Sequence, residues 1–147
     1  MRLTTFTDYC LRVLMYVGIR NGELATIDEI AGCYGISRNH LMKVVYRLGQ
    51  LGYVETLRGK GGGIRLALDP AAINLGALVR ETEDELALVE CLQASPGSCR
   101  ILSACVLKGA LGEALDAFLA VLDGYTLADL LAPRRRLAGL FERPEID

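Results

Sequence analysis

The sequence lacks any apolar run of the roughly 18 to 20 residues that a membrane-spanning helix requires. Its opening, MRLTTFTDYCLR, lacks the apolar core and the small-residue cleavage site of a signal peptide. It also contains no internal repeat and no tract of low complexity. These absences predict a cytosolic protein without a membrane segment.

Histidine is scarce, because His40 is the only one in the chain. A lone histidine without obvious catalytic partners does not indicate a nucleophilic or acid–base site. The glycine-rich GKGGG at 59–63 lies between two expected strands and lacks the Lys and Ser or Thr that complete a phosphate-binding loop. We therefore do not expect an enzyme.

The composition is that of a folded protein, with 52% hydrophobic and 23% charged residues among 147. This length fits one domain, or a small domain with an appended dimerisation element. The net charge of −2 conceals an asymmetry: residues 1–68 hold nine Lys and Arg against five acids, or +4, and residues 69–147 hold seven against thirteen, or −6. A basic first half indicates contact with an anion, most often nucleic acid.

Three helices are expected in the first third of the chain. Apolar side chains recur at helical spacing over 6–17 and are followed by an Asn-Gly stop signal. Thr26 and Glu29 have the spacing of a capping box, which predicts a short second helix that ends near Gly35. Ser37 then offers a hydroxyl cap to a third helix. The apolar residues of that third helix are Leu41, Val44, Val45, Leu48 and Leu51.

A β-hairpin is expected next, with strands over 53–58 and 64–68 and a flexible glycine-rich tip between them. A helix-turn-helix followed by a basic hairpin is the order of a winged helix, whose third helix enters the major groove of DNA. The predicted fold is mainly α with a small β-hairpin. It comprises a winged helix-turn-helix DNA-binding domain over 1–70, then a cysteine-containing loop and a long dimerisation helix over 71–147.

Basic residues gather where DNA would lie in such a domain, since 37–65 contains six Lys and Arg and one acid, Glu55. The front of the third helix is expected to contact base edges, because Arg can pair with guanine and Asn with adenine. The hairpin is expected to contact phosphates or the minor groove. The helix candidates are Ser37, Arg38, Asn39, His40 and Lys43. The hairpin candidates are Arg58, Lys60 and Arg65.

The second half is expected to supply a dimer contact. Asn74 can cap a helix that reaches the acidic run at 81–85, and a loop around SPGS follows. A long amphipathic segment then extends roughly 25 to 28 Å. Its apolar face is larger than the small winged helix-turn-helix domain needs, so we expect a second copy of the chain to cover it. The last residues, APRRRLAGLFERPEID, predict a short helix and a frayed tail. The apolar face of the long segment consists of Leu107, Leu111, Leu115, Phe118, Leu119 and Leu122.

Five cysteines in a reducing compartment indicate metal binding or redox chemistry rather than a disulfide framework. Cys91, Cys99 and Cys105 flank a pliable Pro-Gly-Ser stretch, and three soft donors in one loop can hold a metal centre. The alternative is that all three are small buried hydrophobes. We expect that packing role for Cys10 and Cys33, which lie at helical core spacing.

Zinc would lack a ligand in this loop, because a closed structural site usually needs four Cys or His and His40 lies on the expected DNA-contacting helix. An iron-sulfur cluster accepts ligands other than Cys, so three thiolates and one outside ligand suit it. We favour the four-iron form, and the two-iron form stays open because the same ligands could serve either. A cluster with one replaceable ligand suits a sensor.

The opening MRLTTFTDYCLRVLMYV, the segment TIDEIAGCYGISRNHLMKVVYRLGQLGYVETLRGKGGGIRL and the three late cysteines resemble the family of iron-sulfur winged-helix repressors. The resemblance covers essentially the whole chain to Asp123. The TDY at 7–9 and the cysteine triad are similar to the branch of that family that senses nitric oxide. Members of the cluster-assembly branch have a histidine three residues after the last cysteine, where this chain has Lys108.

The resemblance implies a homodimer with one cluster per subunit, held by Cys91, Cys99 and Cys105. An aspartate that matches Asp8 would reach across from the partner subunit as the fourth ligand. The resemblance further implies a repressor that binds a palindromic operator in double-stranded DNA and releases it when nitric oxide attacks the cluster. Residue type alone gives Asp8 a different role: its negative charge in the first turn of a helix interacts favourably with the positive end of the helix dipole.

Other interpretations of the same residues stay open. The chain could be a winged-helix regulator that senses another redox signal or iron-sulfur status, or a regulator based on zinc or on thiols. A redox relay without DNA binding would use the same cysteines but would not explain the basic hairpin. Colour, iron and sulfide content distinguish a cluster from a zinc or thiol site.

Overall fold

The computed structural model describes residues 2–95 and 97–142. It confirms a mainly α fold with a small β-hairpin, and none of the helices in these ranges is long and apolar enough to cross a membrane. Short 3-10 turns lie at Pro70–Ala72, Glu90–Leu92 and Leu102–Ala104. The other elements are α1 (Thr5–Ile19), α2 (Ile27–Tyr34), α3 (Arg38–Gln50), β1 (Val54–Leu57), β2 (Gly63–Leu66), α4 (Leu75–Thr82), α5 (Val106–Asp123), α6 (Leu127–Leu130) and α7 (Arg134–Phe141).

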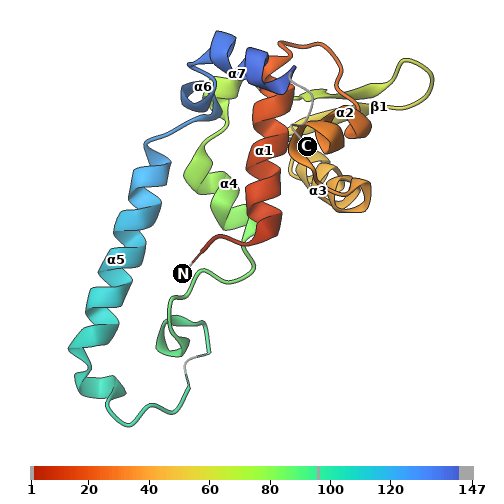
Figure 1. Cartoon of the computed structure of the whole chain (residues 1–147). Helices are drawn as coiled ribbons and strands as arrows, with labels where there is room; N and C mark the ends of the chain where they lie inside the picture. The colour runs from red at the N-terminus through yellow and green to blue at the C-terminus, as the bar shows by residue number, and fades with distance from the viewer. Residues whose placement is uncertain (1, 96, 143–147) are drawn as a thin grey trace.

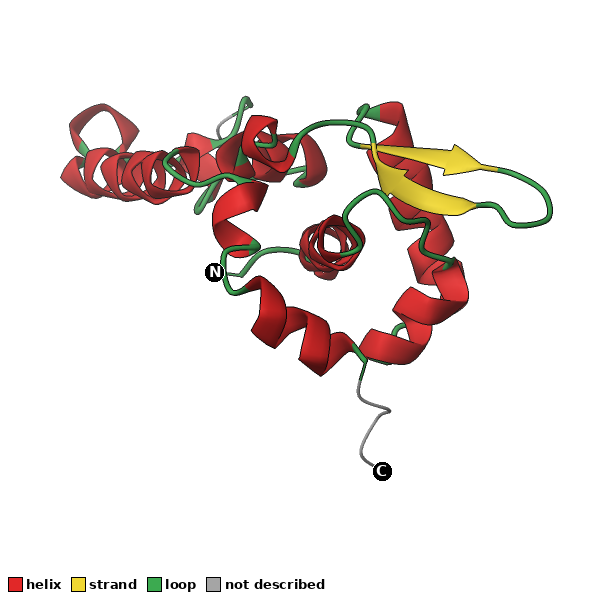
Figure 2. Ribbon diagram, turned by 90° about the horizontal axis from the view of Figure 1, so that it is seen from above, coloured by secondary structure: helices red, strands yellow, loops and turns green. Residues whose placement is uncertain are grey.

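Helix α1 is the centre of the head, which comprises α1 to α4, the hairpin, α6 and α7. Figure 2 shows α1 end-on with other elements of the head around it, and α1 contacts α3, β2, α4, α6 and α7. Val13 and Leu14 of α1 are fully buried, as the apolar periodicity predicts. Ile73, Leu78 and Leu127 belong to the same core. Both predicted domains therefore contribute side chains to one core, and the boundary at residue 70 stays a prediction.

Helix boundaries in the head follow caps that the sequence predicts. Helix α1 begins at Thr5, one residue before the expected start. Helix α2 has the capping box: the Thr26 hydroxyl accepts from the Glu29 N–H at 3.2 Å, and the Glu29 carboxylate accepts from the Thr26 N–H at 2.6 Å. Gly35 ends α2 with a φ of 62°, a conformation that favours glycine, and Ser37 caps α3.

The predicted hairpin is present, with antiparallel strands somewhat shorter than the sequence indicates. Ala25 extends the sheet beyond β2, because its N–H donates to the Ile64 carbonyl at 2.9 Å and its carbonyl accepts from the Ile64 N–H at 2.7 Å. This bridge was not predicted from the sequence. A Cβ at Gly62 would lie 2.2 Å from the Leu57 carbonyl oxygen, so the tip requires glycine there.

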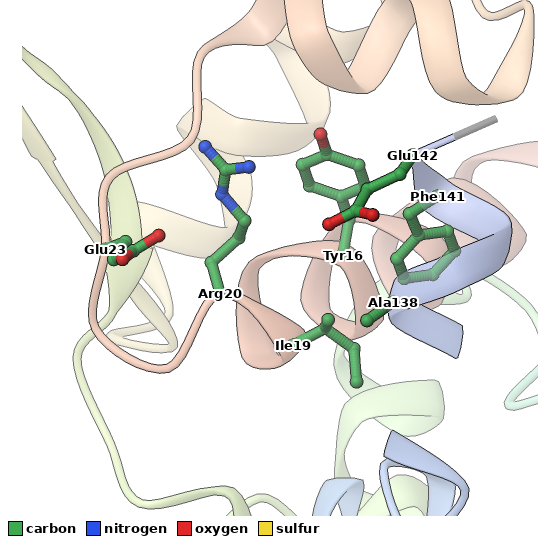
Figure 3. A pocket seen from close by; sticks show the side chains of 7 residues that line it. All are labelled: Tyr16, Ile19, Arg20, Glu23, Ala138, Phe141 and Glu142. Carbon is green, nitrogen blue, oxygen red and sulfur yellow. The ribbon is translucent and has the colours of Figure 1, made fainter. Parts of the chain in front are cut away.

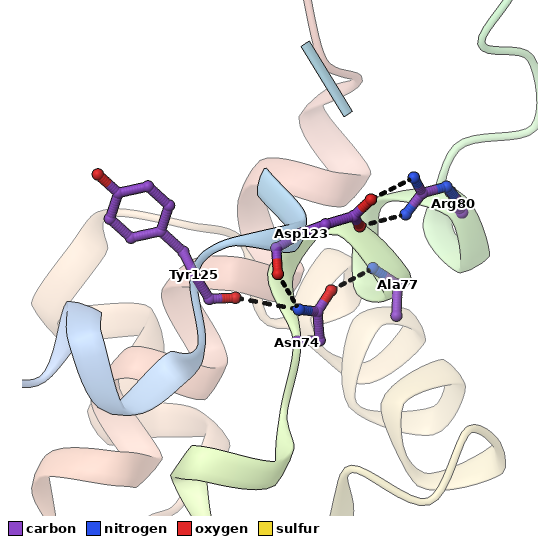
Figure 4. A network of polar contacts seen from close by, with 5 residues as sticks. All are labelled: Asn74, Ala77, Arg80, Asp123 and Tyr125. Atoms are coloured by element: carbon purple, nitrogen blue, oxygen red, sulfur yellow. Dashed lines mark hydrogen bonds and ion pairs between the residues drawn. The ribbon is translucent and has the colours of Figure 1, made fainter. Parts of the chain in front are cut away.

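A polar network joins α4 to the end of α5 (Figure 4). The Arg80 guanidinium donates two hydrogen bonds to the Asp123 carboxylate, at 2.6 and 2.8 Å. The Asn74 side chain accepts from the Ala77 N–H at 3.0 Å and donates to the Asp123 carbonyl at 2.8 Å. Gly76 gives this network room, because a Cβ there would lie 1.8 Å from Asp123 Oδ1. The network fixes where α5 meets the head.

Helix α5 runs beside α4 and extends beyond the head (Figure 1). Its apolar residues are mostly uncovered, since Leu119 alone is buried among its 18 residues, and Val106 and Leu107 are 86% and 64% exposed. Residues 83–105, which we call the cysteine segment, precede α5. None of its described residues is buried. The described residues of the cysteine segment and α5 therefore form no core of their own.

The end of the chain returns to α1. The Phe141 and Tyr16 rings lie 5.2 Å apart between centroids, and Arg134 donates to the Ile19 carbonyl at 3.0 Å, one of the groups that a helix end leaves unpaired. Figure 3 shows the open hollow of about 280 Å³ that Tyr16, Arg20 and Phe141 border. Helix α7 confirms the short helix predicted near the end of the chain. The predicted frayed tail falls largely on 143–147, outside the described residues.

Candidate functional site

The front of α3 presents the residues that the sequence predicts to contact DNA. The Ser37 hydroxyl accepts from the His40 N–H at 3.3 Å and so caps the helix. Ser37, Asn39, His40 and Lys43 are all exposed. The opposite face of α3 packs into the core through Leu41, Val44, Val45 and Leu48. Burial of this apolar face holds the polar face toward solvent, where a groove of DNA can receive it.

Two of these residues contact neighbouring helices. Arg38 forms an ion pair with Asp28 of α2, and their side chains are 57% and 74% exposed. An exposed pair contributes about 0 to 1 kcal/mol, so Arg38 can exchange Asp28 for DNA at little cost. The His40 ring lies 6.2 Å from the Tyr9 ring of α1, centroid to centroid. The front of α3 therefore contacts both α1 and α2.

The predicted hairpin residues Arg58, Lys60 and Arg65 are also exposed. Arg65 pairs with Glu55 across the two strands. The tip contains two glycines at positive φ, which lets the backbone turn sharply beside Lys60. In both views the hairpin and α3 lie on the side of the head away from α5 (Figures 1 and 2). The structure thus brings the two predicted DNA-contacting groups to one side.

The three predicted metal ligands lie in the cysteine segment. Cys91 is in the turn Glu90–Leu92, and Cys105 is the N-cap of α5. Cys91 and Cys99 border the same small hollow of about 180 Å³, which Cys105 does not line. In the described parts of the chain no three His, Cys, Asp or Glu side chains are arranged to hold a metal ion. The structure therefore brings two of the three thiols together.

The donor set nevertheless suits an iron-sulfur cluster by its chemistry. All three thiols are free of disulfides, and thiolates are the preferred ligands of such clusters. Cys105 does not cap α5 with its side chain, and the unpaired N–H groups at the start of that helix favour negative charge nearby. Three thiols leave one ligand position to be filled from outside the cysteine segment.

Asp8 lies in the first turn of α1 and is about half exposed. Its carboxylate pairs with Arg12 of the same helix at 2.9 Å, at the spacing of one helical turn. Cys10 is fully buried, as expected, and burial raises the pKa of its thiol to about 12. Cys33 packs against the core and is half-buried. These placements favour core roles for Cys10 and Cys33 and leave Asp8 accessible.

Two further residues of the exposed face of α3 were not predicted from the sequence to belong to the candidate DNA-contacting surface. Met42 and Tyr46 are 50% and 69% exposed, and the Tyr46 hydroxyl accepts from the Gln50 amide at 3.1 Å. Their spacing from Asn39 places them on its helix face. The helical periodicity of the segment indicates their position. They were not predicted because DNA contacts were expected from polar and charged side chains.

The chain is similar over most of its length to named transcriptional regulators. A family model, Rrf2, described as an iron-dependent transcriptional regulator, matches residues 3–133. The HTH-type transcriptional regulator NsrR of Bacillus subtilis (strain 168) is 56% identical over 146 residues, 99% of this chain and 100% of that protein. The protein of the same name from Geobacillus kaustophilus (strain HTA426) is 54% identical over 143 residues, 97% of each.

Solved structures give the same fold. CymR, the global cysteine regulator of B. subtilis, has a TM-score of 0.69 and 27% identity over 88% of this chain and 95% of that chain. IscR of T. potens has a TM-score of 0.71 over 99% of this chain and 94% of that chain, and at 23% identity it supports the fold alone. These neighbours confirm the winged-helix prediction.

The resemblance that the sequence indicates is therefore confirmed, and the relatives are named as regulators rather than enzymes. The exposed α3 front and hairpin fit a DNA-binding regulator of transcription. The chain belongs to the Rrf2 family of iron-dependent transcriptional regulators.

Proposed function

We propose that this protein is a homodimeric repressor that binds a palindromic operator and releases it when nitric oxide reacts with an iron-sulfur cluster. The observation that carries the proposal is the cysteine triad. Its three thiols form no disulfide, and they lie in the cysteine segment directly before α5. The chain shares more than half of its residues with two regulators named NsrR, and this similarity supports the proposal. A DNA-binding role also favours a cytoplasmic location.

Cys91, Cys99 and Cys105 would hold the cluster, and Asp8 of the partner subunit would be the fourth ligand. When bound, such a cluster supplies iron that combines readily with nitric oxide. Closing the cysteine segment around three thiols is compatible with its lack of buried residues, because few packing contacts must be broken. We favour four irons over two; the same ligands could serve either form, so the iron and sulfide count per subunit decides between them.

The dimer would form through α5. Most of the apolar face that the sequence predicts for dimer contact is already half-buried or buried within the subunit, including Leu111 and Leu119. The exposed apolar side chains lie on another face of α5, where Val106, Ala110, Ala117 and Val121 follow one another at helical spacing. Small side chains on such a face allow a second helix to approach closely, and burial of their apolar area favours association. Two heads held by one interface would then present two α3 helices to successive major grooves, which explains a palindromic operator.

Residues at the start of α1 connect the proposed fourth ligand to the DNA-contacting front of α3. Asp8 is next to Tyr9, whose ring lies against His40 at the front of α3. When the Asp8 carboxylate does not bind the cluster, it can pair with Arg12 of its own helix. Exchange of Asp8 between these two states would shift the start of α1 and, through Tyr9, the residues of α3 that contact bases.

Titration of anaerobically loaded protein with nitric oxide tests this function. Fluorescence anisotropy of a labelled operator duplex would report binding while visible absorption reports the cluster. We expect DNA affinity to fall in step with loss of the original absorption. Unchanged affinity after complete loss of that absorption would refute the coupling. Anaerobic native mass spectrometry of the same sample would give the iron and sulfide count and the subunit number.

A further inference from the structure

The exposed face of α3 is not uniformly polar. Arg38, Asn39, Met42, Lys43 and Tyr46 share this face, which we call the groove face. The core covers the opposite face of the helix, so rotation of α3 cannot hide these residues. Of the two apolar members, Tyr46 has a hydroxyl that accepts from Gln50. Met42 offers only a flexible thioether chain, half of which is exposed.

Met42 occupies the second turn of α3, between Asn39 one turn before it and Tyr46 one turn after it. When a helix enters the major groove, side chains near its N-terminus contact base edges. A side chain flanked by Asn39 and Lys43 would therefore lose its water when DNA binds. A polar base edge opposite the thioether would lose a hydrogen bond to water without gaining one, which is unfavourable.

The major groove displays one apolar group, the 5-methyl of thymine. We propose that Met42 is a specificity-determining residue that contacts the 5-methyl group of one thymine in each half-site. The assignment rests on the proposed contact of the groove face with DNA and adds the base that its apolar centre prefers. The flexible side chain adapts to the position of the methyl group, so Met42 needs no fixed partner in the free protein.

Replacement of thymine by deoxyuridine tests this contact, because it removes the methyl group and leaves the hydrogen-bonding edge intact. The probe is a palindromic duplex selected from a random library by the cluster-loaded wild-type dimer. Each symmetric pair of thymines is replaced in turn, and affinity is measured by anisotropy. One methyl group contributes about a fourfold change in affinity for each half-site. We expect a loss of about fifteenfold at one symmetric pair, because replacing the pair removes one methyl group from each half-site.

The variants Met42→Ala and Met42→Leu identify the side chain responsible. Met42→Ala should bind the thymine duplex more weakly and should not distinguish thymine from uracil at that pair, whereas Met42→Leu should keep much of the discrimination. Lys43→Ala is the matched control, because it should weaken binding to every duplex and keep the uracil effect. Both Met42 variants should fold, since the side chain is half exposed.

Two results would overturn the proposal: a wild-type protein that is insensitive to uracil at every position, or a Met42→Ala variant that keeps the full uracil effect. Asn39→Ala and Lys43→Ala separate this failure from failure of the interface itself. If both bind DNA as the wild type does, the groove face does not contact DNA and the proposed interface is wrong. If both weaken binding while Met42→Ala keeps its uracil effect, the assignment of Met42 alone is wrong.

Discussion

The head and the cysteine segment differ in what holds them in place. The head has a continuous core around α1, and side chains such as Thr26 and Ser37 cap its helices. The cysteine segment consists of loop and two 3-10 turns, and none of its described residues is buried. The head is therefore stabilised by its own side chains. The proposed cluster and second subunit would supply the contacts that the described residues of the cysteine segment lack.

The strongest test of this contrast is removal of one thiol from each region. Cys99→Ser should abolish cluster binding, because the segment has no further cysteine to replace it. Cys33→Ala, in the head, is the matched control and should keep iron and sulfide at wild-type levels. Iron, sulfide and visible absorption of anaerobic preparations measure the result. Full iron content in Cys99→Ser would show that the triad is not the ligand set.

Truncation of a side chain in the head should lower stability far more than truncation of an exposed side chain in α5. Leu41→Ala removes a fully buried side chain of α3 and should lower the free energy of unfolding by about 2 to 5 kcal/mol. Val106→Ala removes a side chain that is 86% exposed in the single chain and should lower it by less than about 0.5 kcal/mol within one subunit.

Denaturant titration at several protein concentrations measures both effects, since a dimer contribution depends on concentration. Sedimentation should show weaker dimerisation for Val106→Ala and not for Leu41→Ala at temperatures where both are folded. Equal losses of subunit stability in the two variants would remove the contrast between head and α5.

Within the DNA-binding side, α3 and the hairpin should respond differently. Arg38→Ala should weaken binding to the operator by about 1 to 3 kcal/mol and relax its specificity if Arg38 contacts a base. Lys60→Ala should weaken binding to all sequences and reduce the slope of affinity against salt by about one. Binding measured on operator and random duplexes at several salt concentrations distinguishes them. Equal effects of both variants on random DNA would contradict the assignment.

The smallest expected effect lies at the junction of α4 and α5. Hydrogen bonds from Arg80 lower the pKa of Asp123 below its usual 3.8. Because the folded pKa lies below the unfolded one, this stabilisation is present above the unfolded pKa and is lost as pH falls through the folded pKa. Asp123→Asn should therefore flatten the acid dependence of stability below about pH 4. An unchanged acid profile in thermal melts would show that the ion pair does not fix the junction.

Local signals made much of the head predictable. The capping residues Thr26, Ser37 and Asn74 each begin a helix where the sequence indicates, because a cap and its helix lie within a few residues of each other. The bridge from Ala25 to Ile64 and the docking of α7 on α1 were not predicted. Those contacts join residues far apart in the chain and leave no periodic trace in the sequence.

The candidate site divides in the same way. Charged residues of α3 and the hairpin follow from a motif with a known order of elements, whereas Met42 was missed because apolar side chains are expected inside. The cysteine triad follows from composition and spacing. Its geometry could not be derived, because in the proposed function it depends on a bound cluster and on a second subunit. The role of Asp8 stays a prediction for the same reason. The division between residues 70 and 71 stays a prediction because both parts of the chain contribute side chains to one core.

The central claim is that a cluster held by the late cysteines controls how two basic heads bind DNA. Operator affinity, measured together with iron and sulfide content on anaerobically purified protein, tests it most directly. The account predicts a brown dimer that contains iron and sulfide and binds its operator, and much weaker binding after the iron is removed. A colourless, iron-free preparation that binds the operator as tightly as the loaded protein would contradict it.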